Sequence, residues 1–503
     1  MRTLLSGGIV VDGTGNTPSA ADVWIEDERI AALGTISGAA DFTIDCTGLT
    51  IAPGFIDAHS HSDLQVLENR TEKVLQGVTT EIVGNCGFSP YPAPADRQPL
   101  HEFANGIFRG GDAWGWNSAA EYLASAAVSS RLVHVVSLVG HGSLRIAFAG
   151  TRPGPLSEPE LDAMEHALEE SLAGGACGLS TGLMYSPGES APFAELERLC
   201  RVVARRGKIY ATHMRDYGFH LVESLGEQIE LARRTGCRLQ ISHFQAVGEA
   251  NWSRQAAALE TIERARDEGL DVAFDCYPYV AGSTVLSQLL PQWTLGGGIS
   301  GLMECLADPG IRARIARETI AGMAHRWTDL FIAAVASAAN QRVVGRSIQE
   351  IAELRACEPI DVVLDLLEEE RSAVNMLEFN QSLENLRQTL THPLSNIISD
   401  GFYVTGRPHP RLHGTFPELL GAICRERRWM ELPDAIRKIT SRPAERFGLR
   451  DRGLVRAGYY ADLVIFDAAR ISSSATYDRP EQPPEGIHYV LRDGEFTVRR
   501  GPT

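Results

Sequence analysis

The chain has 503 residues and a formal net charge of −17, with 44% hydrophobic and 22% charged residues. This acidic balance disfavours non-specific binding to nucleic acid or to an anionic membrane. No run of about 18 apolar residues occurs, so we expect no membrane span, and the length predicts one large domain with accessory parts.

The N-terminal residues carry one early arginine and a short apolar run broken by glycines, which is not the pattern of a signal peptide. Nine scattered cysteines in a chain of this length do not indicate a disulfide framework. We therefore expect a cytoplasmic protein whose partner is a small molecule, with no membrane or nucleic-acid partner. A homo-oligomer is left open.

Both ends of the chain alternate short apolar runs with turns. Hairpin signals occur at Asp12-Gly13, near Asp27-Glu28 and at Asp493-Gly494. Because chain termini tend to lie near each other, we expect residues 1–53 and 452–503 to form one small β-sandwich domain.

The middle of the chain alternates helices with strands at a spacing of about 30 residues, the length of a βα unit. Ser157 and Glu160 form a capping-box pattern at the start of one helix, and further helices are expected over 221–235 and 254–268. The expected strands lie in the segments IAPGFIDAH, TTEIVGN, LVHVVSLVGH, ACGLS, KIYAT, RLQIS, DVAFDCY and NIISD. Eight such strands predict an α/β fold with a (β/α)8 TIM-type barrel over 54–451, in which chemistry gathers at the C-terminal strand ends.

Residues 284–345 interrupt this alternation with irregular, glycine-containing stretches. An insertion that follows a barrel strand commonly covers the active-site mouth. We expect this segment to be a lid or small subdomain inserted in the barrel.

Potential metal ligands follow several of the expected strands. They are His59, His61, Cys86, His213, His243 and Asp400. Each taken alone is more often structural: a buried cysteine, a hydrogen-bonded histidine or an aspartate in a turn. Together at one end of a barrel they indicate a metal site, and imidazole with thiolate suits Zn²⁺.

Other polar and apolar residues near the strand ends fit more than one role. His141 and His413 suit either a supporting position beside the metal or a purely structural one. Leu183, Met184 and Tyr185 could line a side-chain pocket, although such a trio is commonly core.

The motifs in these segments resemble the amidohydrolase superfamily. GFIDAHSHSD and GVTTEIVGNCGFSP carry this resemblance, and the C-terminal TSRPAERFGLRDRGLVRAGYYADLVIFD is similar to the closing segment of that superfamily. Within it the chain is similar to the D-aminoacylase, or N-acyl-D-amino-acid deacylase, family. The motifs shared in order are GNCGFS, GLSTGLMYSPG, ATHMR, ISHF, DCYPYVAGST, SDG and HPRLHGTFPELLG. The similarity is weakest over 284–345 and around 346–390.

This resemblance implies a metal set. Cys86, His213 and His243 would hold a tightly bound Zn²⁺, with Cys86 standing where most amidohydrolases use a carboxylated lysine. A thiolate is anionic and can bridge two metals. A second, weaker metal position would be lined by His59, His61 and Asp400.

The resemblance also implies roles around the substrate. Asp400 would act as general base, taking a proton from the attacking water and returning it to the departing amine. Arg411, with Tyr277 and Ser283, would bind the α-carboxylate of the leaving amino acid. Gln245 stands where family members often carry lysine, so the amine half could instead be an amide, an ester, a ring or a dipeptide-like group.

Three functional hypotheses follow. The first is a zinc amidase that releases the acyl group from N-acyl-D-amino acids or close analogues. The second is another amidohydrolase reaction, such as cyclic-amide hydrolysis of the dihydroorotase or hydantoinase kind, or a dipeptidase-like activity on D-residues. The third is a non-catalytic scaffold, which the complete ligand set opposes.

Overall fold

The centre of the molecule is an eight-stranded parallel sheet rolled into a barrel, seen in the computed structural model, which describes residues 1–108 and 114–500. In order around the sheet the strands are β6 (Phe55–Asp57), β7 (Val78–Val83), β8 (His134–Gly140), β9 (Gly178–Gly182), β10 (Ile209–His213), β11 (Arg238–Ile241), β12 (Val272–Cys276) and β16 (Ser395–Ile397). A parallel bridge between Ser60 and Gly401 brings the two edge strands together just beyond their ends. The predicted barrel is confirmed.

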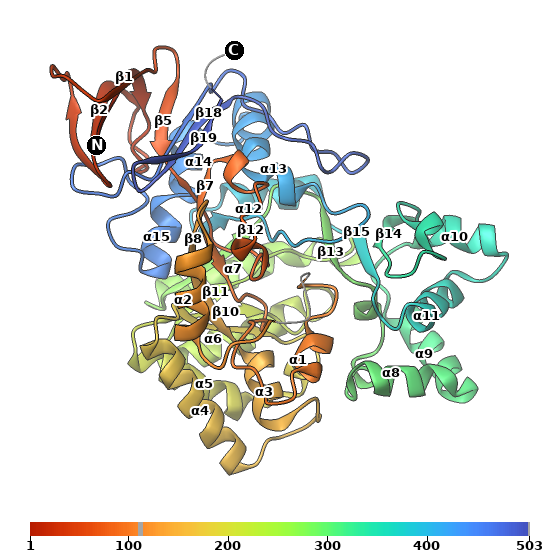
Figure 1. Ribbon diagram of the computed structural model, residues 1–503. Helices are drawn as coiled ribbons and strands as arrows, with labels where there is room; N and C mark the ends of the chain where they lie inside the picture. Colours follow the sequence, from red (N-terminus) through yellow and green to blue (C-terminus); the bar gives the residue numbers. More distant parts are fainter. Residues whose placement is uncertain (109–113, 501–503) are drawn as a thin grey trace.

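Helices surround this barrel (Figure 1). The longer ones are α2 (Ala119–Ser129), α3 (His141–Ala149), α4 (Glu158–Ala173), α5 (Phe193–Arg205), α6 (Leu221–Thr235), α7 (Arg254–Asp267) and α12 (Leu383–Thr391). The shorter ones are α1 (Gln98–Phe103), α13 (Arg411–Glu418), α14 (Leu432–Lys438) and α15 (Ser441–Phe447), with a π-helical segment over Leu419–Glu426. The capping box of Ser157 and Glu160 forms as predicted, and no helix among the described residues is long and apolar enough to cross a membrane.

A second sheet combines both ends of the chain (Figure 1). Its strands are β1 (Arg2–Val10), β2 (Ser19–Glu26), β3 (Arg29–Gly34), β4 (Phe42–Asp45), β5 (Thr50–Pro53), β17 (Leu463–Phe466), β18 (Ile487–Arg492) and β19 (Glu495–Arg499). The N-terminal β5 pairs antiparallel with the C-terminal β17. The contribution of both termini to one sheet is therefore confirmed.

The segment IAPGFIDAH, expected as one strand, is divided between the two sheets. Its first part is β5 of the terminal sheet and its second part is β6 of the barrel. Gly54 lies at the junction, where a Cβ atom would come 2.2 Å from Oγ1 of Thr79. A larger residue at this position would collide with the side chain of Thr79, so the chain passes between the two sheets at a glycine.

An arginine links the terminal sheet to the barrel. Arg452 donates a hydrogen bond to Nε2 of His134 at 2.8 Å, forms an ion pair with Asp462, and reaches Asp493 at 3.0 Å. These three partners could otherwise be taken for a metal-ligand group. The guanidinium already supplies their positive charge, which makes the group an ion-pair network between the two sheets.

Between β12 and β16 the chain leaves the barrel and forms a separate unit with its own apolar core, visible on one side of Figure 1. Its strands β13 (Ala281–Val285), β14 (Leu330–Ala334) and β15 (Asn375–Phe379) are ordered β13-β15-β14. Its helices are α8 (Gly298–Ala307), α9 (Pro309–Gly322), α10 (Ile348–Arg355) and α11 (Pro359–Glu369). The predicted insertion over 284–345 lies inside this segment, and its lid role stays a prediction.

Candidate metal centre and substrate cavity

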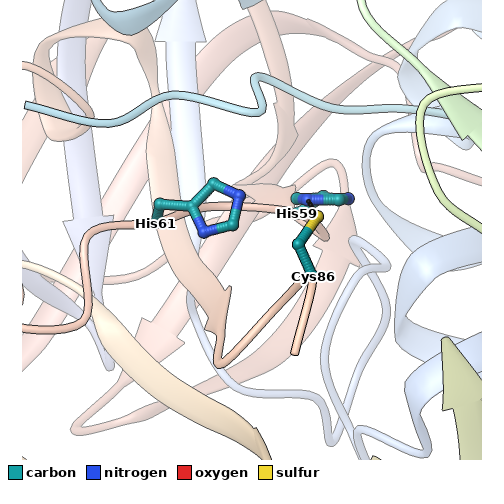
Figure 2. Close-up of side chains that lie close together, drawn as sticks. All are labelled: His59, His61 and Cys86. Atoms are coloured by element: carbon teal, nitrogen blue, oxygen red, sulfur yellow. Dashed lines mark hydrogen bonds between the residues drawn. The ribbon is translucent and has the colours of Figure 1, made fainter. Parts of the chain in front are cut away.

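The predicted metal ligands meet at the C-terminal ends of the barrel strands. The ligand atoms of His59, His61 and Cys86 all lie within 4.8 Å of one another, and so do those of Cys86, His213 and His243. Figure 2 shows the first group, with the sulfur of Cys86 beside the ring of His59. Cys86 is therefore common to two adjoining three-ligand groups.

The sulfur of Cys86 lies within hydrogen-bonding range of two histidines, which is also the spacing of ligands around one metal ion. Cys86 Sγ lies 3.3 Å from Nε2 of His59 and 3.5 Å from Nε2 of His243. Within the described chain, both ring nitrogens of His213 are buried without a hydrogen-bond partner. Buried polar atoms are rarely left unpaired, so this donor set fits a metal ion such as Zn²⁺.

Three of these residues have an unusual backbone conformation. Cys86, His243 and Asp400 have φ angles of 52°, 34° and 50°, in the left-handed region that non-glycine residues seldom enter. Each follows the end of a barrel strand, where a left-handed residue turns the chain and redirects its side chain. Such strain costs about 1–3 kcal/mol per residue and clusters at functional sites.

The glycines beside Cys86 allow the turn that carries it. A Cβ at Gly84 would come 2.1 Å from the carbonyl oxygen of Leu138, and one at Gly87 would come 2.8 Å from the amide nitrogen of Gly182. The turn is thus pressed against the two following strands of the barrel. Close packing on both sides fixes the direction of the thiol.

A carboxylate that was not predicted from the sequence contacts two of the candidate ligands. Asp275, at the end of β12, accepts a hydrogen bond from the backbone N–H of His243 at 2.6 Å. The same oxygen lies 3.4 Å from Nδ1 of His59. An acid orients a ligating imidazole and raises its basicity. The sequence feature that could have indicated this role is an aspartate inside the otherwise apolar strand segment DVAFDCY.

A buried lysine, which was not predicted from the sequence, contacts the first barrel strand, β6. Lys73 is 1% exposed and pairs with Asp57, while its ammonium also reaches Ser399 and lies 3.8 Å from Glu81. Ser60, between the two histidines of this strand, donates to Glu81 at 2.7 Å. Because Lys73 is satisfied by these partners, it stabilises the loop that carries the histidines.

Burial lowers the pKa of His213 well below the usual range and that of His243 to about 4, so both imidazoles are neutral and able to donate a lone pair. Burial acts in the same direction on His59, but the charges of Cys86, Asp275 and Asp400 outweigh it and raise the pKa of that histidine well above its usual range. Burial raises the pKa of the Cys86 thiol. Metal binding must therefore displace a proton from this sulfur.

Asp400 lies between the second histidine of the first strand and an arginine. Its Oδ1 is 3.3 Å from Nε2 of His61, and its Oδ2 is 2.9 Å from a terminal nitrogen of Arg411. Burial alone would raise the pKa of Asp400, but the charges of Arg411 and His59 outweigh it and hold this pKa well below its usual range. The carboxylate is therefore ionised.

The predicted substrate-binding residues surround Arg411, which is 1% exposed. Its guanidinium donates to the backbone oxygen of Ser283 at 3.2 Å and lies 4.9 Å from the ring centre of Tyr277. The Tyr277 hydroxyl donates to Oε1 of Gln245 at 3.2 Å. The hydroxyl of Ser283 is directed elsewhere, donating to the backbone oxygen of Met376 at 3.1 Å, so Ser283 meets Arg411 through its backbone.

Two further histidines have structural contacts. His409, missed from the sequence, accepts from the backbone N–H of Arg411 at 2.9 Å and lies 2.9 Å from the backbone oxygen of Ala281, which fixes the start of α13. His141 lies 2.7 Å from Glu195 in a buried network with Arg145. Of its two possible roles, the structural one therefore fits His141.

A cavity of about 210 Å³ opens onto this cluster. The barrel contributes the candidate ligands other than His59, together with Gln245, Tyr277 and Arg411, and the inserted segment contributes a facing set of side chains. That set includes Ser283, Thr284, Gln288, Leu289, Met323, His325, Met376 and Glu378. Met184 and Tyr185 also line the cavity, whereas Leu183 is core.

Comparisons with known proteins agree with this geometry. Residues 43–498 match the model of the amidohydrolase family. The chain is 36% identical to a D-aminoacylase of Alcaligenes xylosoxydans xylosoxydans, over 98% of this chain and 93% of the relative. It is also 36% identical to an N-acyl-D-glutamate deacylase of the same organism, over 98% and 92%.

A solved structure is similar over the whole length. It is an N-acyl-D-glutamate deacylase of Bordetella bronchiseptica in complex with zinc and a phosphonate inhibitor that mimics the tetrahedral intermediate. Its identity to this chain is 32%, its TM-score is 0.86, and the match covers 100% of this chain and 97% of the other.

Proposed function

The chain belongs to the amidohydrolase family, and from that premise we propose that it is a zinc-dependent deacylase of N-acyl-D-amino acids or close analogues. The products would be a carboxylate and a D-amino acid. The observation that carries the proposal is the placement of Cys86, shared by two ligand groups, in one cavity with Asp400 and Arg411. The preference for D-substrates is supported by the full-length relatives.

We assign the tight zinc position to Cys86, His213 and His243, whose buried ligand atoms lie within reach of one ion. We assign the weaker position to His59, His61 and Asp400, which lie beside the same thiolate. A bound Zn²⁺ would polarise the amide carbonyl and lower the pKa of a water molecule.

Asp400 has the position of the general base. Its ionised carboxylate adjoins the ligand cluster, where it can take a proton as water adds to the amide carbon. When the C–N bond breaks, the same carboxyl group returns that proton to the departing nitrogen. Among the carboxylates that line the described cavity, only Asp400 lies within 3.4 Å of His59 and His61.

Arg411 has the position to bind the α-carboxylate of the amino-acid half. Its Nε is buried without a partner among the described residues, while one terminal nitrogen pairs with Asp400 and the other donates to the backbone oxygen of Ser283. A planar guanidinium with free donors can bind a carboxylate bidentately. Tyr277, stacked near it, and the amide of Gln245 complete this side of the cavity.

Of the alternatives, cyclic-amide hydrolysis is supported by no particular contact of this site. We also propose a cytoplasmic location, because all nine cysteines are free and a reducing compartment keeps them so.

A substrate screen tests the proposed function. Zinc-loaded protein should hydrolyse acetyl, formyl or succinyl derivatives of D-amino acids and leave the L-enantiomers at least about a hundredfold slower, since a site that fixes the carboxylate and the amide together leaves only one direction for the side chain. Released amine is measured together with metal content. Absence of turnover for every D-substrate by metal-replete protein would reject the deacylase function.

A second prediction concerns Gln245, which stands at a position where members of the resembling family often carry lysine. Gln245→Lys should lower KM for N-acetyl-D-amino acids by about tenfold, because a second cation would face the substrate carboxylate. Gln245→Met, which has similar length and no charge, serves as the control. An unchanged KM in Gln245→Lys would show that residue 245 does not face the carboxylate.

A further inference from the structure

The inserted segment places an acidic side chain in the cavity that the proposed reaction does not use. Glu378, on β15, lines the cavity and is 15% exposed. His325, also in the lining and 9% exposed, lies 3.4 Å away, measured from its Nε2 to Oε2 of Glu378. This distance is too long for a strong hydrogen bond, so the carboxylate keeps capacity for another donor.

The facing strand makes room for this carboxylate. Gly282 on β13 is the cross-strand partner of Glu378, and a Cβ at Gly282 would come 2.9 Å from Oε1 of Glu378. The next residue, Ser283, supplies the backbone oxygen that accepts from Arg411. Glu378 therefore occupies the same side of the cavity as the group expected to bind the substrate carboxylate.

Among the side chains of the cavity lining, without the charge that the proposed zinc would add, acids outnumber arginines and lysines. Its carboxylates belong to Asp216, Glu378 and Asp400, whereas Arg411 is the one arginine or lysine among the described lining residues. Asp400 pairs with Arg411 at 2.9 Å, and Asp216 accepts from the backbone N–H of Gly218. Glu378 is thus the acid without an arginine, a lysine or a backbone donor on it, its polar neighbours being His325 and the side chain of Asn380.

We propose that Glu378, oriented by His325, makes this protein select N-acyl-D-amino acids whose side chain ends in a cation, such as those of lysine, ornithine or arginine. This inference rests on the proposed deacylase function. A buried carboxylate without a matching cation is unfavourable, and a ligand cation relieves that cost. An acidic side chain would meet repulsion there.

Other lining residues fit the same substrate class. Leu289 and Met323, from the same inserted segment, offer apolar surface for the methylene stem of such a side chain. Burial raises the pKa of Glu378, and the charges of His325 and Arg411 partly offset this effect. A bound ammonium or guanidinium would likewise lower the pKa of Glu378 and so stabilise its carboxylate form.

The test compares side chains of matched length in zinc-loaded protein. Released amine is measured for N-acetyl derivatives of D-lysine, D-arginine, D-norleucine, D-glutamine and D-glutamate. The wild-type kcat/KM for D-lysine should exceed that for D-glutamate by at least about a hundredfold and that for D-norleucine by about tenfold. Glu378→Gln should reduce the lysine-to-norleucine ratio by about tenfold, and Glu304→Gln, an exposed change on α8, should leave this ratio unchanged.

The outcomes separate this inference from the function on which it rests. If D-norleucine and D-glutamate derivatives are hydrolysed as well as the D-lysine derivative, or if Glu378→Gln leaves the ratio unchanged, the role of Glu378 is rejected while the deacylase function stands. If no N-acetyl-D-amino acid is hydrolysed, both proposals are rejected. The wild-type comparison decides the question even if the variant does not fold.

Discussion

Asp400→Asn is expected to lower kcat/KM for an N-acyl-D-amino acid by about a thousandfold while zinc content stays at the wild-type level. A general base contributes about 10²–10⁴ to the rate, and asparagine cannot take the proton of the attacking water. Zinc should remain because the proposed tight ligands, Cys86, His213 and His243, are unchanged. Steady-state kinetics and metal analysis on the same preparation measure both quantities.

The control for this change is Asp308→Asn. Asp308 caps α9 by accepting from the backbone N–H groups of Gly310 and Ile311, far along the chain from the cluster, and asparagine caps helices comparably well. This variant should keep full activity. If Asp400→Asn instead lost its zinc, Asp400 would be mainly a metal ligand, and the assignment of the general base would fail.

Removal of the shared thiolate should have the other large effect. Cys86→Gly is expected to lose bound zinc and with it at least about a thousandfold in activity, because both ligand groups contain this sulfur and thiolate is the anionic ligand of each. Glycine is preferred to alanine here, since Cys86 has a φ of 52° and glycine adopts that conformation without strain. Folding should therefore be retained, as thermal unfolding of the metal-free proteins would show.

A matched control is available on a helix outside the barrel sheet. Cys200, fully buried on α5 in the apolar core, can be replaced by alanine at a cost of about 1–2 kcal/mol in stability from lost packing. Its zinc content and activity should not change. A Cys86→Gly protein that still held one zinc and remained active would overturn the assignment of Cys86 as the shared ligand.

The two ligand groups can also be separated. His213→Ala should remove the tightly bound zinc together with activity, whereas His61→Ala should affect only the second, weaker position. Metal titration of the two variants distinguishes these effects. Equal losses in both would contradict the division into a tight and a weak position.

The local sequence determined much of the barrel. Helix starts such as Ser157 with Glu160, glycine stops such as Gly236, and short apolar runs at regular spacing are signals that depend on neighbours in the chain. These signals located eight strands, and the polar residues that follow the strands gave the predicted metal ligands. The parallel barrel then brings strand ends together whatever the detailed packing.

Other features depend on contacts between residues far apart in the sequence, and only the tertiary structure decided them. The division of IAPGFIDAH at Gly54 results from pairing with two different partners, β17 in the terminal sheet and β7 in the barrel. The support of two ligands by Asp275 requires neighbouring strands in register. No local pattern distinguishes these contacts from ordinary core packing.

The cavity shows this division most clearly. The sequence located Arg411 and the unusual Gln245, but the pairing of Arg411 with Asp400 depends on how α13 packs against the barrel. Glu378 and His325 enter the cavity from a segment that forms its own sheet and core. The residue types that follow the strands were therefore sufficient to predict a metal centre. The charge of the substrate pocket was decided by the tertiary packing of the insertion, because electrostatic neighbours are set by distance in space.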